Sequence, residues 1–230
     1  MTAILLVTPL RKEFDALAGF FTSEGYKSEN FQSKTTAARF PELDITIAAG
    51  GGGKASFAVA AQYLIDTCGP FSLFIAAGTA GALDQALKPG DVILGTETVE
   101  HDYKSRFGGN EFLQRHISCA DSRRAISDVH REQNSFTLRT GPIASGDEDI
   151  IEPRRARELR GQTGALCVAW EGAGGARAAK FNGIPFLEIR AITDLADSDT
   201  PKAFYENLAA AMINIGRVLL PWLTHRRNGS

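Results

Sequence analysis

Short apolar runs rich in β-branched residues alternate along this chain with segments of helical periodicity, and this alternation constrains the fold more than any other feature. The runs that predict strands cover residues 3–8, 45–49, 71–77, 92–99, 142–144, 165–168 and 186–192. The segments that predict helices cover residues 12–22, 55–67, 121–132, 152–160, 171–182 and 203–223. Strands that alternate with helices favour a mainly parallel sheet with helices on both faces. The sequence therefore predicts an α/β fold.

Two regions depart from this alternation. Residues 103–140 are polar and basic, and we interpret them as a surface excursion with one helix near residues 121–132. Residues 224–230 form a polar tail that we expect to be frayed. Because no internal repeat or linker divides the sequence, we expect residues 1–230 to form a single domain.

Composition narrows the classes of function. Of the 230 residues, 43% are hydrophobic and 23% are charged, which is typical of a globular protein rather than a disordered or fibrous one. The net charge of −2 provides no broad attraction to nucleic acid or to an anionic membrane. No apolar run reaches the ~18 residues of a transmembrane helix. A small molecule is therefore the expected partner.

The cysteines indicate the compartment and the absence of a metal. Cys68, Cys119 and Cys167 are far apart, and the sequence contains neither a CxxC pair nor the His–Cys spacing of a zinc site. Such a sparse, odd number of cysteines suits a reducing cytoplasm. We therefore expect a cytoplasmic protein without bound metal or cofactor, in which each cysteine is a small apolar packing residue.

A glycine-rich segment, residues 50–53, follows the predicted strand at 45–49. It does not fit a P-loop, because the first glycine of that motif would fall on Ala48 and because Ala55 stands where a Ser or Thr holds magnesium. The spacing of a dinucleotide-binding fingerprint is also poor. Two interpretations remain: a tight strand-to-helix turn, or a helix start whose backbone N–H groups face a ligand.

Acidic residues stand at the carboxyl ends of three predicted strands. Glu13 lies just past the first strand, Glu171 follows the strand at 165–168, and Asp194 follows the strand at 186–192. Ligands bind beyond the carboxyl ends of strands in open α/β sheets, so these carboxylates can converge on one cleft. Such a group can divide the acid, base and hydroxyl-binding roles of a reaction.

Two further segments belong to the same edge of the predicted sheet. Residues 78–81, Gly-Thr-Ala-Gly, follow the strand at 71–77, and their small side chains let the backbone approach a flat ligand. Residues 145–147, Ser-Gly-Asp, follow the short strand at 142–144. For any one of these features the alternative is structural, such as a simple turn or a solvated helix N-terminus. Their joint placement is what favours a binding site.

Several motifs, taken together, resemble one enzyme superfamily. They are Ala-Ala-Gly-Thr-Ala-Gly-Ala-Leu at 76–83, Leu-Lys-Pro-Gly-Asp-Val at 87–92, His-Asp at 101–102, Cys-Val-Ala-Trp-Glu-Gly-Ala at 167–173 and Arg-Ala-Ile-Thr-Asp-Leu-Ala-Asp at 190–197. In this order they resemble the nucleoside phosphorylase/nucleosidase superfamily, and most closely the methylthioadenosine/S-adenosylhomocysteine nucleosidases. The resemblance covers nearly the whole chain. It implies a three-layer αβα sandwich with a central mixed sheet that is partly closed as a barrel.

The resemblance also implies a reaction, the hydrolysis of the N-glycosidic bond between a purine and a ribosyl group. By motif, Asp194 is the general acid that protonates the purine at N7, Glu13 positions and deprotonates the attacking water, and Glu171 accepts hydrogen bonds from the ribose hydroxyls. Breaking this bond develops positive charge on the sugar and negative charge on the base. An acid at the base and a carboxylate at the sugar favour these two charges.

Other residues are placed around the substrate by the same resemblance. Phe204 covers the ribose side, and Phe107 reaches into the pocket of a partner subunit, as an aromatic residue does in dimeric members of the family. The resemblance therefore implies a homodimer. The residues that it places around the base or the sugar are Thr79, Ala80, Gly81 and Ile150.

The chain departs from the family pattern at three positions of the expected pocket. Ala169 stands where the family usually has a second Glu, two residues before the ribose Glu, and Trp170 stands where it usually has Met. Asp149 replaces an aromatic residue that stacks on the purine. We expect Trp170 to restore some aromatic surface and Asp149 to suit a substrate with an additional amino group or a cation. The alternatives are a core tryptophan and an aspartate that points to solvent.

The sequence also bears on the nucleophile. Phosphorylases of this superfamily have an arginine two residues before the Gly of the Gly-Ser/Thr turn, where this chain has Ala76. A methyl group cannot replace a bidentate guanidinium, and Arg11 alone makes a poor anion clamp. We therefore expect water as the nucleophile. The alternatives are a phosphate-dependent purine nucleoside phosphorylase, a nucleosidase of a larger adenosyl conjugate, and a non-catalytic nucleoside-binding module, against which the three acids speak.

Overall fold

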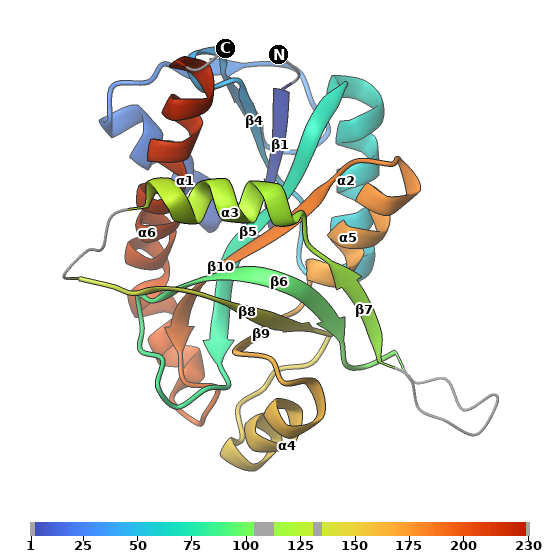
Figure 1. Cartoon of the computed structure of the whole chain (residues 1–230), viewed down its shortest axis with the longest axis vertical. Helices are drawn as coiled ribbons and strands as arrows, with labels where there is room; N and C mark the ends of the chain where they lie inside the picture. Colours follow the sequence, from blue (N-terminus) through green and yellow to red (C-terminus); the bar gives the residue numbers. More distant parts are fainter. Residues whose placement is uncertain (1–2, 104–112, 131–134, 229–230) are drawn as a thin grey trace.

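The computed structural model describes residues 3–103, 113–130 and 135–228, and its strands form a mixed sheet (Figure 1). The order across the sheet is β10-β6-β8-β9-β5-β1-β4-β3-β2, and β7 pairs with β6 off this path. The strands are β1 (Ala3–Thr8), β2 (Glu29–Asn30), β3 (Ala37–Phe40), β4 (Ile45–Ala49), β5 (Phe71–Ala82), β6 (Val92–Glu100), β7 (Gln114–Ile117), β8 (Leu138–Ser145), β9 (Cys167–Ala169) and β10 (Phe186–Asp194).

Part of the sheet closes on itself. The long strand β5 pairs in parallel with β1 and with β10, and its last residues pair antiparallel with β9. Because β10 pairs with β6, β6 with β8 and β8 with β9, these strands and β5 form a closed barrel. Strands β1, β4, β3 and β2 continue the sheet beyond β5. The mixed, partly barrel-closed sheet that the family resemblance implied is confirmed.

Helices cover both faces of the sheet. They are α1 (Arg11–Ser23), α2 (Lys54–Cys68), α3 (Ala120–Val129), α4 (Pro153–Thr163), α5 (Gly172–Phe181) and α6 (Thr200–Asn228), with a short 3-10 helix at Pro41–Leu43. In Figure 1, α1, α3 and α6 lie on one side of the sheet and α2 and α5 on the other, while α4 lies below the barrel. This arrangement gives the three layers.

Apolar packing holds the two helical layers against the strands. Leu17 and Phe21 of α1 and Ile215 of α6 are fully buried against the sheet on one face. On the other face, the ring of Phe57 in α2 stacks on that of Phe74 in β5, with centroids 6.3 Å apart. Each fully buried side chain of this size stabilises the fold by about 1.5–3 kcal/mol. The carboxyl ends of β1, β5 and β10 are thereby fixed relative to one another.

The sheet is mixed, and its central strands β1, β4, β5 and β10 pair in parallel. Antiparallel pairs β2–β3, β3–β4, β5–β9, β6–β7 and β6–β10 stand beside the parallel ones. Three of the strands involved were not predicted at all. Strands β2 and β7 are short, polar and largely exposed, and β3 has the sequence Ala-Ala-Arg-Phe, which lacks β-branched residues. Their strand character comes from pairing with a neighbour rather than from local propensity.

Two predictions fail at the ends of elements. The strand predicted at 71–77 does not end at residue 77, because β5 continues through residues 78–81 in register with β10, with Gly78 opposite Arg190. Residues 224–228 of the tail that we expected to be frayed are helical, since α6 continues to Asn228. The predicted helix at 121–132 is α3, and part of that range lies outside the described residues.

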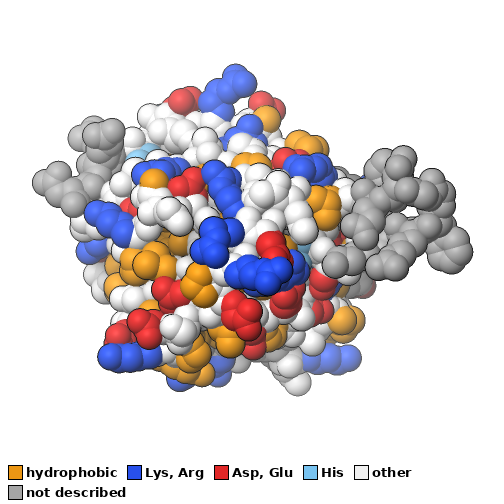
Figure 2. Space-filling model, turned by 90° about the horizontal axis from the view of Figure 1, so that it is seen from below, with side chains coloured by type: hydrophobic (Ala, Val, Ile, Leu, Met, Phe, Trp, Pro, Cys, Tyr) orange, Lys and Arg blue, Asp and Glu red, His pale blue; other side chains and the backbone are white. Residues whose placement is uncertain are grey.

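The surface carries charges of both signs. Figure 2 shows Lys, Arg, Asp and Glu side chains interspersed with apolar ones over the lower face of the molecule in Figure 1. On this face, neither sign of charge forms a continuous patch. Within the described ranges, no helix combines the length and the apolarity needed to cross a membrane.

Candidate active site

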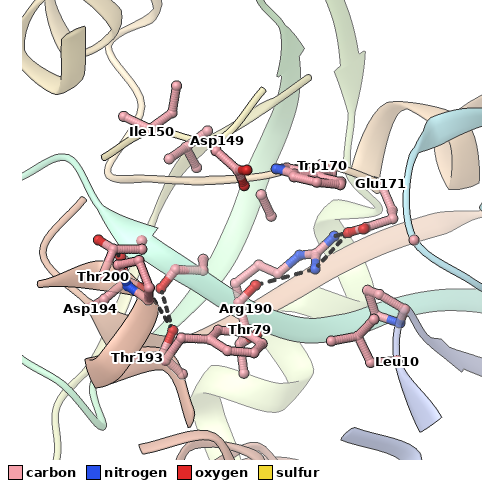
Figure 3. A pocket seen from close by; sticks show the side chains of 18 of the residues that line it. Leu10, Thr79, Asp149, Ile150, Trp170, Glu171, Arg190, Thr193, Asp194 and Thr200 are labelled. Atoms are coloured by element: carbon pink, nitrogen blue, oxygen red, sulfur yellow. Dashed lines mark hydrogen bonds and ion pairs between the residues drawn. The ribbon is translucent and has the colours of Figure 1, made fainter. Parts of the chain in front are cut away.

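A cavity of about 470 Å³ opens beyond the carboxyl ends of β5 and β10, beside the first turns of α1 and α6 (Figure 3). Its lining comes from segments far apart in the sequence. Phe107 lies outside the described residues. The predicted site residues that the structure does describe all line this cavity, namely Glu13, Thr79, Ala80, Gly81, Asp149, Ile150, Trp170, Glu171, Asp194 and Phe204.

Glu13 is held in one orientation by the start of α1 and by β5. One carboxylate oxygen, Oε2, accepts a hydrogen bond from the Leu10 N–H at 2.8 Å, which satisfies a free donor at the helix start. The other, Oε1, accepts hydrogen bonds from both the N–H and the hydroxyl of Thr79, each at 2.7 Å. Burial raises the pKa of Glu13 above its ordinary value, although these donors oppose the shift. A carboxylate with a raised pKa is suited to take a proton.

Glu171 precedes α5 and faces the glycine-rich segment. Its Oε1 accepts a hydrogen bond from the Gly53 N–H at 3.2 Å, and its Oε2 lies 3.4 Å from the guanidinium of Arg190. Burial raises the pKa of Glu171, and Arg190 opposes that shift. The next N–H along the chain, that of Lys54, is donated to the Asp147 carboxylate at 2.8 Å. These two N–H groups at the start of α2 therefore bind protein carboxylates and are not free for an external ligand.

Arg190 is the cation of the site and was not recognised as a functional residue in the sequence. It is 1% exposed, and its Nε donates to Glu188 Oε1 at 2.8 Å. Burial lowers the pKa of Arg190, but the surrounding carboxylates outweigh this and raise it overall. A side-chain carbon at Gly78 would lie 2.7 Å from Arg190 Nη1 and 3.1 Å from Glu13 Oε1, so only glycine admits both groups. A lone arginine inside an apolar strand was the signal that could have identified it.

Asp194 ends β10 and is fixed by three donors. Its Oδ2 lies 2.8 Å from the Thr193 hydroxyl, and its Oδ1 accepts hydrogen bonds from the Ala196 N–H at 3.0 Å and the Thr200 hydroxyl at 2.9 Å. Two of these donors are hydroxyls, which can rotate to accept a hydrogen bond when the carboxyl is protonated. We refer to Glu13, Glu171, Arg190 and Asp194 together as the floor of the cavity.

The opposite side, which we call the roof, consists of Asp149, Ile150 and Trp170. The indole of Trp170 is 37% exposed, and its Nε1 donates to the Glu148 carbonyl oxygen at 3.0 Å. Figure 3 shows the carboxylate of Asp149 and the edge of the indole directed toward each other above the cavity. Among the described residues, Asp149 has no hydrogen-bond or ion-pair partner in the protein, whereas its neighbour Glu148 is paired with Arg155. The indole thus supplies an aromatic surface and Asp149 an unpaired carboxylate.

Two predictions about other residues can be compared with these positions. Ala76 is fully buried within β5, and Arg11 is directed away from the cavity, with its guanidinium bonded to Asp15 and to the Thr36 hydroxyl. Cys167 is buried, and burial raises the pKa of its thiol, as expected for a packing residue. In the portion that the structure describes, no cluster of His, Cys, Asp and Glu side chains is arranged to hold a metal ion.

Carboxylates beside one buried guanidinium, at the carboxyl ends of barrel strands, define an enzyme-like site for a small polar molecule with a flat, apolar part. The family described as "Phosphorylase superfamily" matches residues 2–223. The chain therefore belongs to the phosphorylase superfamily, and the resemblance inferred from the motifs is confirmed.

Individual relatives point to one branch of that superfamily. The chain is 27% identical over 201 residues to the 5′-methylthioadenosine/S-adenosylhomocysteine nucleosidase of Thermotoga maritima, covering 87% of this chain and 85% of that protein. It is 31% identical over 193 residues to the enzyme of the same name from Pseudoalteromonas translucida, covering 78% and 79%. The crystal structure of the Neisseria meningitidis nucleosidase in complex with methylthio-immucillin-A superposes with a TM-score of 0.86 at 26% identity, covering 98% of this chain and 100% of that one.

Proposed function

We propose that this protein hydrolyses the N-glycosidic bond of a purine nucleoside, a 5′-substituted adenosine, and releases the free base. The observation that carries the proposal is the hydrogen bonding of Glu13. Its carboxylate takes both donors of Thr79 and lies beside Arg190 on the floor, at the sugar end of the cavity. The names of the relatives support the same bond type.

At the base end, Asp194 acts as the general acid. Its carboxyl group lies against Gly81, in the part of the cavity that Ala80, Gly81 and Ile150 line with small and apolar groups suited to a purine ring. As the bond between the sugar and N9 breaks, the proton of Asp194 passes to purine N7, and the base leaves neutral. Contacts with the Thr193 hydroxyl, the Ala196 N–H and the Thr200 hydroxyl hold the carboxyl group in one orientation, so it stays in place as its proton passes to the base.

At the sugar end, Glu171 acts on the ribose and Glu13 acts on the attacking water. Glu171 accepts hydrogen bonds from the ribose hydroxyls and favours the positive charge that develops on the sugar. Glu13 orients a water molecule and takes its proton as the oxygen attacks C1′. One proton is thus given to the base by Asp194 and one is taken from water by Glu13. Exchange of these protons with solvent returns both carboxyl groups to their starting states.

Water, rather than phosphate, is the nucleophile. A phosphate anion at this end of the cavity would find the N–H and the hydroxyl of Thr79 already donated to the Glu13 carboxylate. Ala76 provides no cation, Arg11 points away, and the guanidinium of Arg190 is already surrounded by carboxylates. An anion brought into this environment would meet uncompensated negative charge.

The roof bears on the substrate class. The unpaired carboxylate of Asp149 can accept a hydrogen bond from an amino group or pair with a cationic substituent of the nucleoside. Trp170 offers its indole face in place of the aromatic residue that family members carry at the position of Asp149. Because the roof is open to solvent, a larger adenosyl conjugate is the second candidate substrate.

We also propose that the protein acts as a cytoplasmic homodimer. The three unpaired cysteines suit a reducing compartment. A partner subunit that contributes Phe107 would cover the open side of the cavity, where Trp170 is 37% and Tyr205 is 67% exposed. Sedimentation that shows only monomer, together with full activity at nanomolar protein, would contradict the dimer.

A base-release assay over a nucleoside panel tests the function. The panel contains adenosine, 5′-deoxyadenosine, methylthioadenosine, S-adenosylhomocysteine and inosine, and free purine is measured by chromatography. We expect release of adenine from the 5′-substituted adenosines, at higher kcat/KM than from adenosine. The absence of base release from every member, with a folded protein, would contradict the proposal.

A further inference from the structure

A fourth carboxylate lies beneath the floor, outside the cavity lining. Glu188 belongs to β10, two residues before Arg190, and is completely buried. Its Oε1 accepts the hydrogen bond from Arg190 Nε at 2.8 Å, and its Oε2 accepts one from the Thr98 hydroxyl of β6. Any side chain at Gly172, the first residue of α5, would collide with this carboxylate. Strands β10 and β6 thus provide hydrogen bonds to Glu188, and α5 leaves space for it at Gly172. This environment is specific to a carboxylate at position 188.

The distances show which carboxylate is the main partner of Arg190. The bond from Nε to Glu188 is 2.8 Å long, whereas both Nη atoms lie 3.4 Å from Glu171 Oε2. Nη1 also lies 3.4 Å from the Thr79 carbonyl oxygen. A charge-assisted hydrogen bond is normally 2.7–2.9 Å long, so only the contact with Glu188 is a fully formed one. Glu188 therefore holds Arg190 through its Nε atom, and the two Nη atoms make only the longer contacts on the cavity side.

The position of the Glu188 carboxylate is informative because the chain has no carboxylate at residue 169. By the family resemblance, Ala169 in β9 stands at a position where a second glutamate is expected. Ala169 is buried and lines the cavity wall. A buried guanidinium needs a counter-charge, and with alanine at this position Glu171 would be its nearest one. Glu171 is also the group that must bind the ribose hydroxyls.

We propose that Glu188 is a positioning residue that serves as the counter-ion of Arg190 in place of the carboxylate absent at Ala169, and so keeps Glu171 available for the ribose hydroxyls. The inference rests on the proposed nucleosidase function. Glu188 acts through Arg190 and does not touch the substrate. Without its charge, the guanidinium would move toward Glu171 and compete with the ribose hydroxyls for Oε2.

Glu171 is the group whose ionisation reports this effect. The charged groups that act on it are Arg190 and Glu188, both from β10. Glu13 of α1 acts on Arg190, and Cys167 of β9 is a titratable neighbour of Glu188. The negative charge of Glu188 contributes to the raised pKa of Glu171, and Arg190 opposes it. Removal of the Glu188 charge therefore shifts the ionisation of Glu171 to lower pH.

The test is the pH profile of kcat/KM for Glu188→Gln, measured with whichever nucleoside the wild-type enzyme cleaves fastest. Glutamine keeps the shape and an acceptor for Arg190 Nε but removes the charge. We expect kcat/KM at neutral pH to fall about ten-fold, which corresponds to a loss of about 1.4 kcal/mol of transition-state stabilisation. The acidic limb of the profile should move to lower pH. A role limited to folding would lower the melting temperature without moving that limb.

Two further variants complete the experiment. Glu100→Gln is the matched control, because Glu100 is equally a buried, ion-paired carboxylate, but its partners are Lys54 and Arg177 rather than Arg190. Its acidic limb should coincide with that of the wild type. The double variant Ala169→Glu/Glu188→Gln places a carboxylate on the wall of the cavity that Arg190 also lines, and it should recover kcat/KM toward the wild-type value.

The outcomes separate the inference from the proposed function. If the wild type releases base but Glu188→Gln keeps its kcat/KM and its acidic limb, the positioning role is wrong while the nucleosidase function stands. If the wild type releases no base, the proposed function itself fails.

Discussion

The floor and the roof of the cavity differ in every physical respect that matters for a reaction. Glu13, Glu171 and Asp194 of the floor are 1%, 6% and 4% exposed, and every carboxylate oxygen among them has a partner in the protein. Trp170 of the roof is 37% exposed, and Asp149 has no partner among the described residues. The floor is therefore preorganised before substrate arrives, and the roof is not.

This difference suggests a division of labour. Preorganised charges act on the bond that breaks, because they need no rearrangement as charge develops. An unpaired, solvated carboxylate and an exposed indole are better suited to discriminate between substrates, because their interactions are completed only by the ligand. We expect changes in the floor to alter kcat by large factors and changes in the roof to alter substrate preference by small ones.

The largest effect is expected from Asp194→Asn. Asparagine keeps the shape and can bond its neighbours, but it cannot transfer a proton. We predict that kcat falls at least ~10²-fold while KM moves only a few-fold, because the proton is needed when the base leaves and not when the nucleoside binds. Steady-state kinetics measures both constants. A folded variant with nearly wild-type kcat and an unchanged melting temperature would contradict the assignment of Asp194 as the general acid.

A smaller but two-sided effect is expected from Glu171→Gln. The hydroxyl contacts of this residue exist in the bound substrate and strengthen in the transition state, so KM should rise and kcat should fall. Hydrogen bonds to a charged group contribute about 1.5–3 kcal/mol, which corresponds to a loss of roughly 10- to 100-fold in kcat/KM. Comparison with Asp194→Asn sharpens the prediction, because KM should rise clearly only for Glu171→Gln. If KM stays at the wild-type value in Glu171→Gln as well, the assignment of Glu171 to the sugar is contradicted.

The pH dependence should also reflect the floor. Burial raises the pKa of Glu13 and of Glu171 above their ordinary value of 4.5. Glu13 must be ionised to take a proton from water, and Glu171 must be ionised to favour positive charge on the sugar. As the pH is lowered, kcat/KM should therefore begin to decline before the pH reaches 4.5. The melting temperature at each pH shows whether the fold is intact. Activity that persists undiminished down to pH 4.5 would be incompatible with this environment.

The smallest effects are expected in the roof. Asp149→Phe introduces a ring beside the purine, and an aromatic contact contributes about 0.5–1.5 kcal/mol, so KM for methylthioadenosine should fall about 2- to 12-fold with kcat nearly unchanged. Asp149→Asn keeps the size and removes the charge. It should lower kcat/KM for methylthioadenosine, whose purine carries an amino group, more than for methylthioinosine, whose purine carries none. If both variants leave the ratio of the two substrates unchanged, Asp149 does not contribute to substrate choice.

The sequence predicted the three acids of the floor better than the course of the strands around them. Glu13, Glu171 and Asp194 could be found because each follows a strand, and strand ends are visible as boundaries of apolar runs. The course of β5 through residues 78–82 could not be predicted, because small residues and glycines usually mark turns, and here barrel closure keeps them extended. Strands β2 and β7 escaped notice since they depend on pairing rather than on their own composition.

The parts of the site that the sequence missed are those that depend on burial. Arg190 and Glu188 lie two residues apart in an apolar strand, and their pairing is visible only once the barrel brings Thr98, Gly172 and Glu171 around them. The roof was the reverse case. Asp149 and Trp170 were noticed as departures from a family pattern, and the structure supplies what the sequence could not, namely that the two side chains face each other above the cavity.

The central claim is that the floor activates water and excludes phosphate. It is tested most directly by the rate of purine release from the preferred nucleoside in phosphate-free buffer and after addition of millimolar phosphate. We predict the same rate in both and a free sugar as the second product, because both donors of Thr79 are held by Glu13. A strong stimulation by phosphate, with the sugar 1-phosphate as product, would contradict the account.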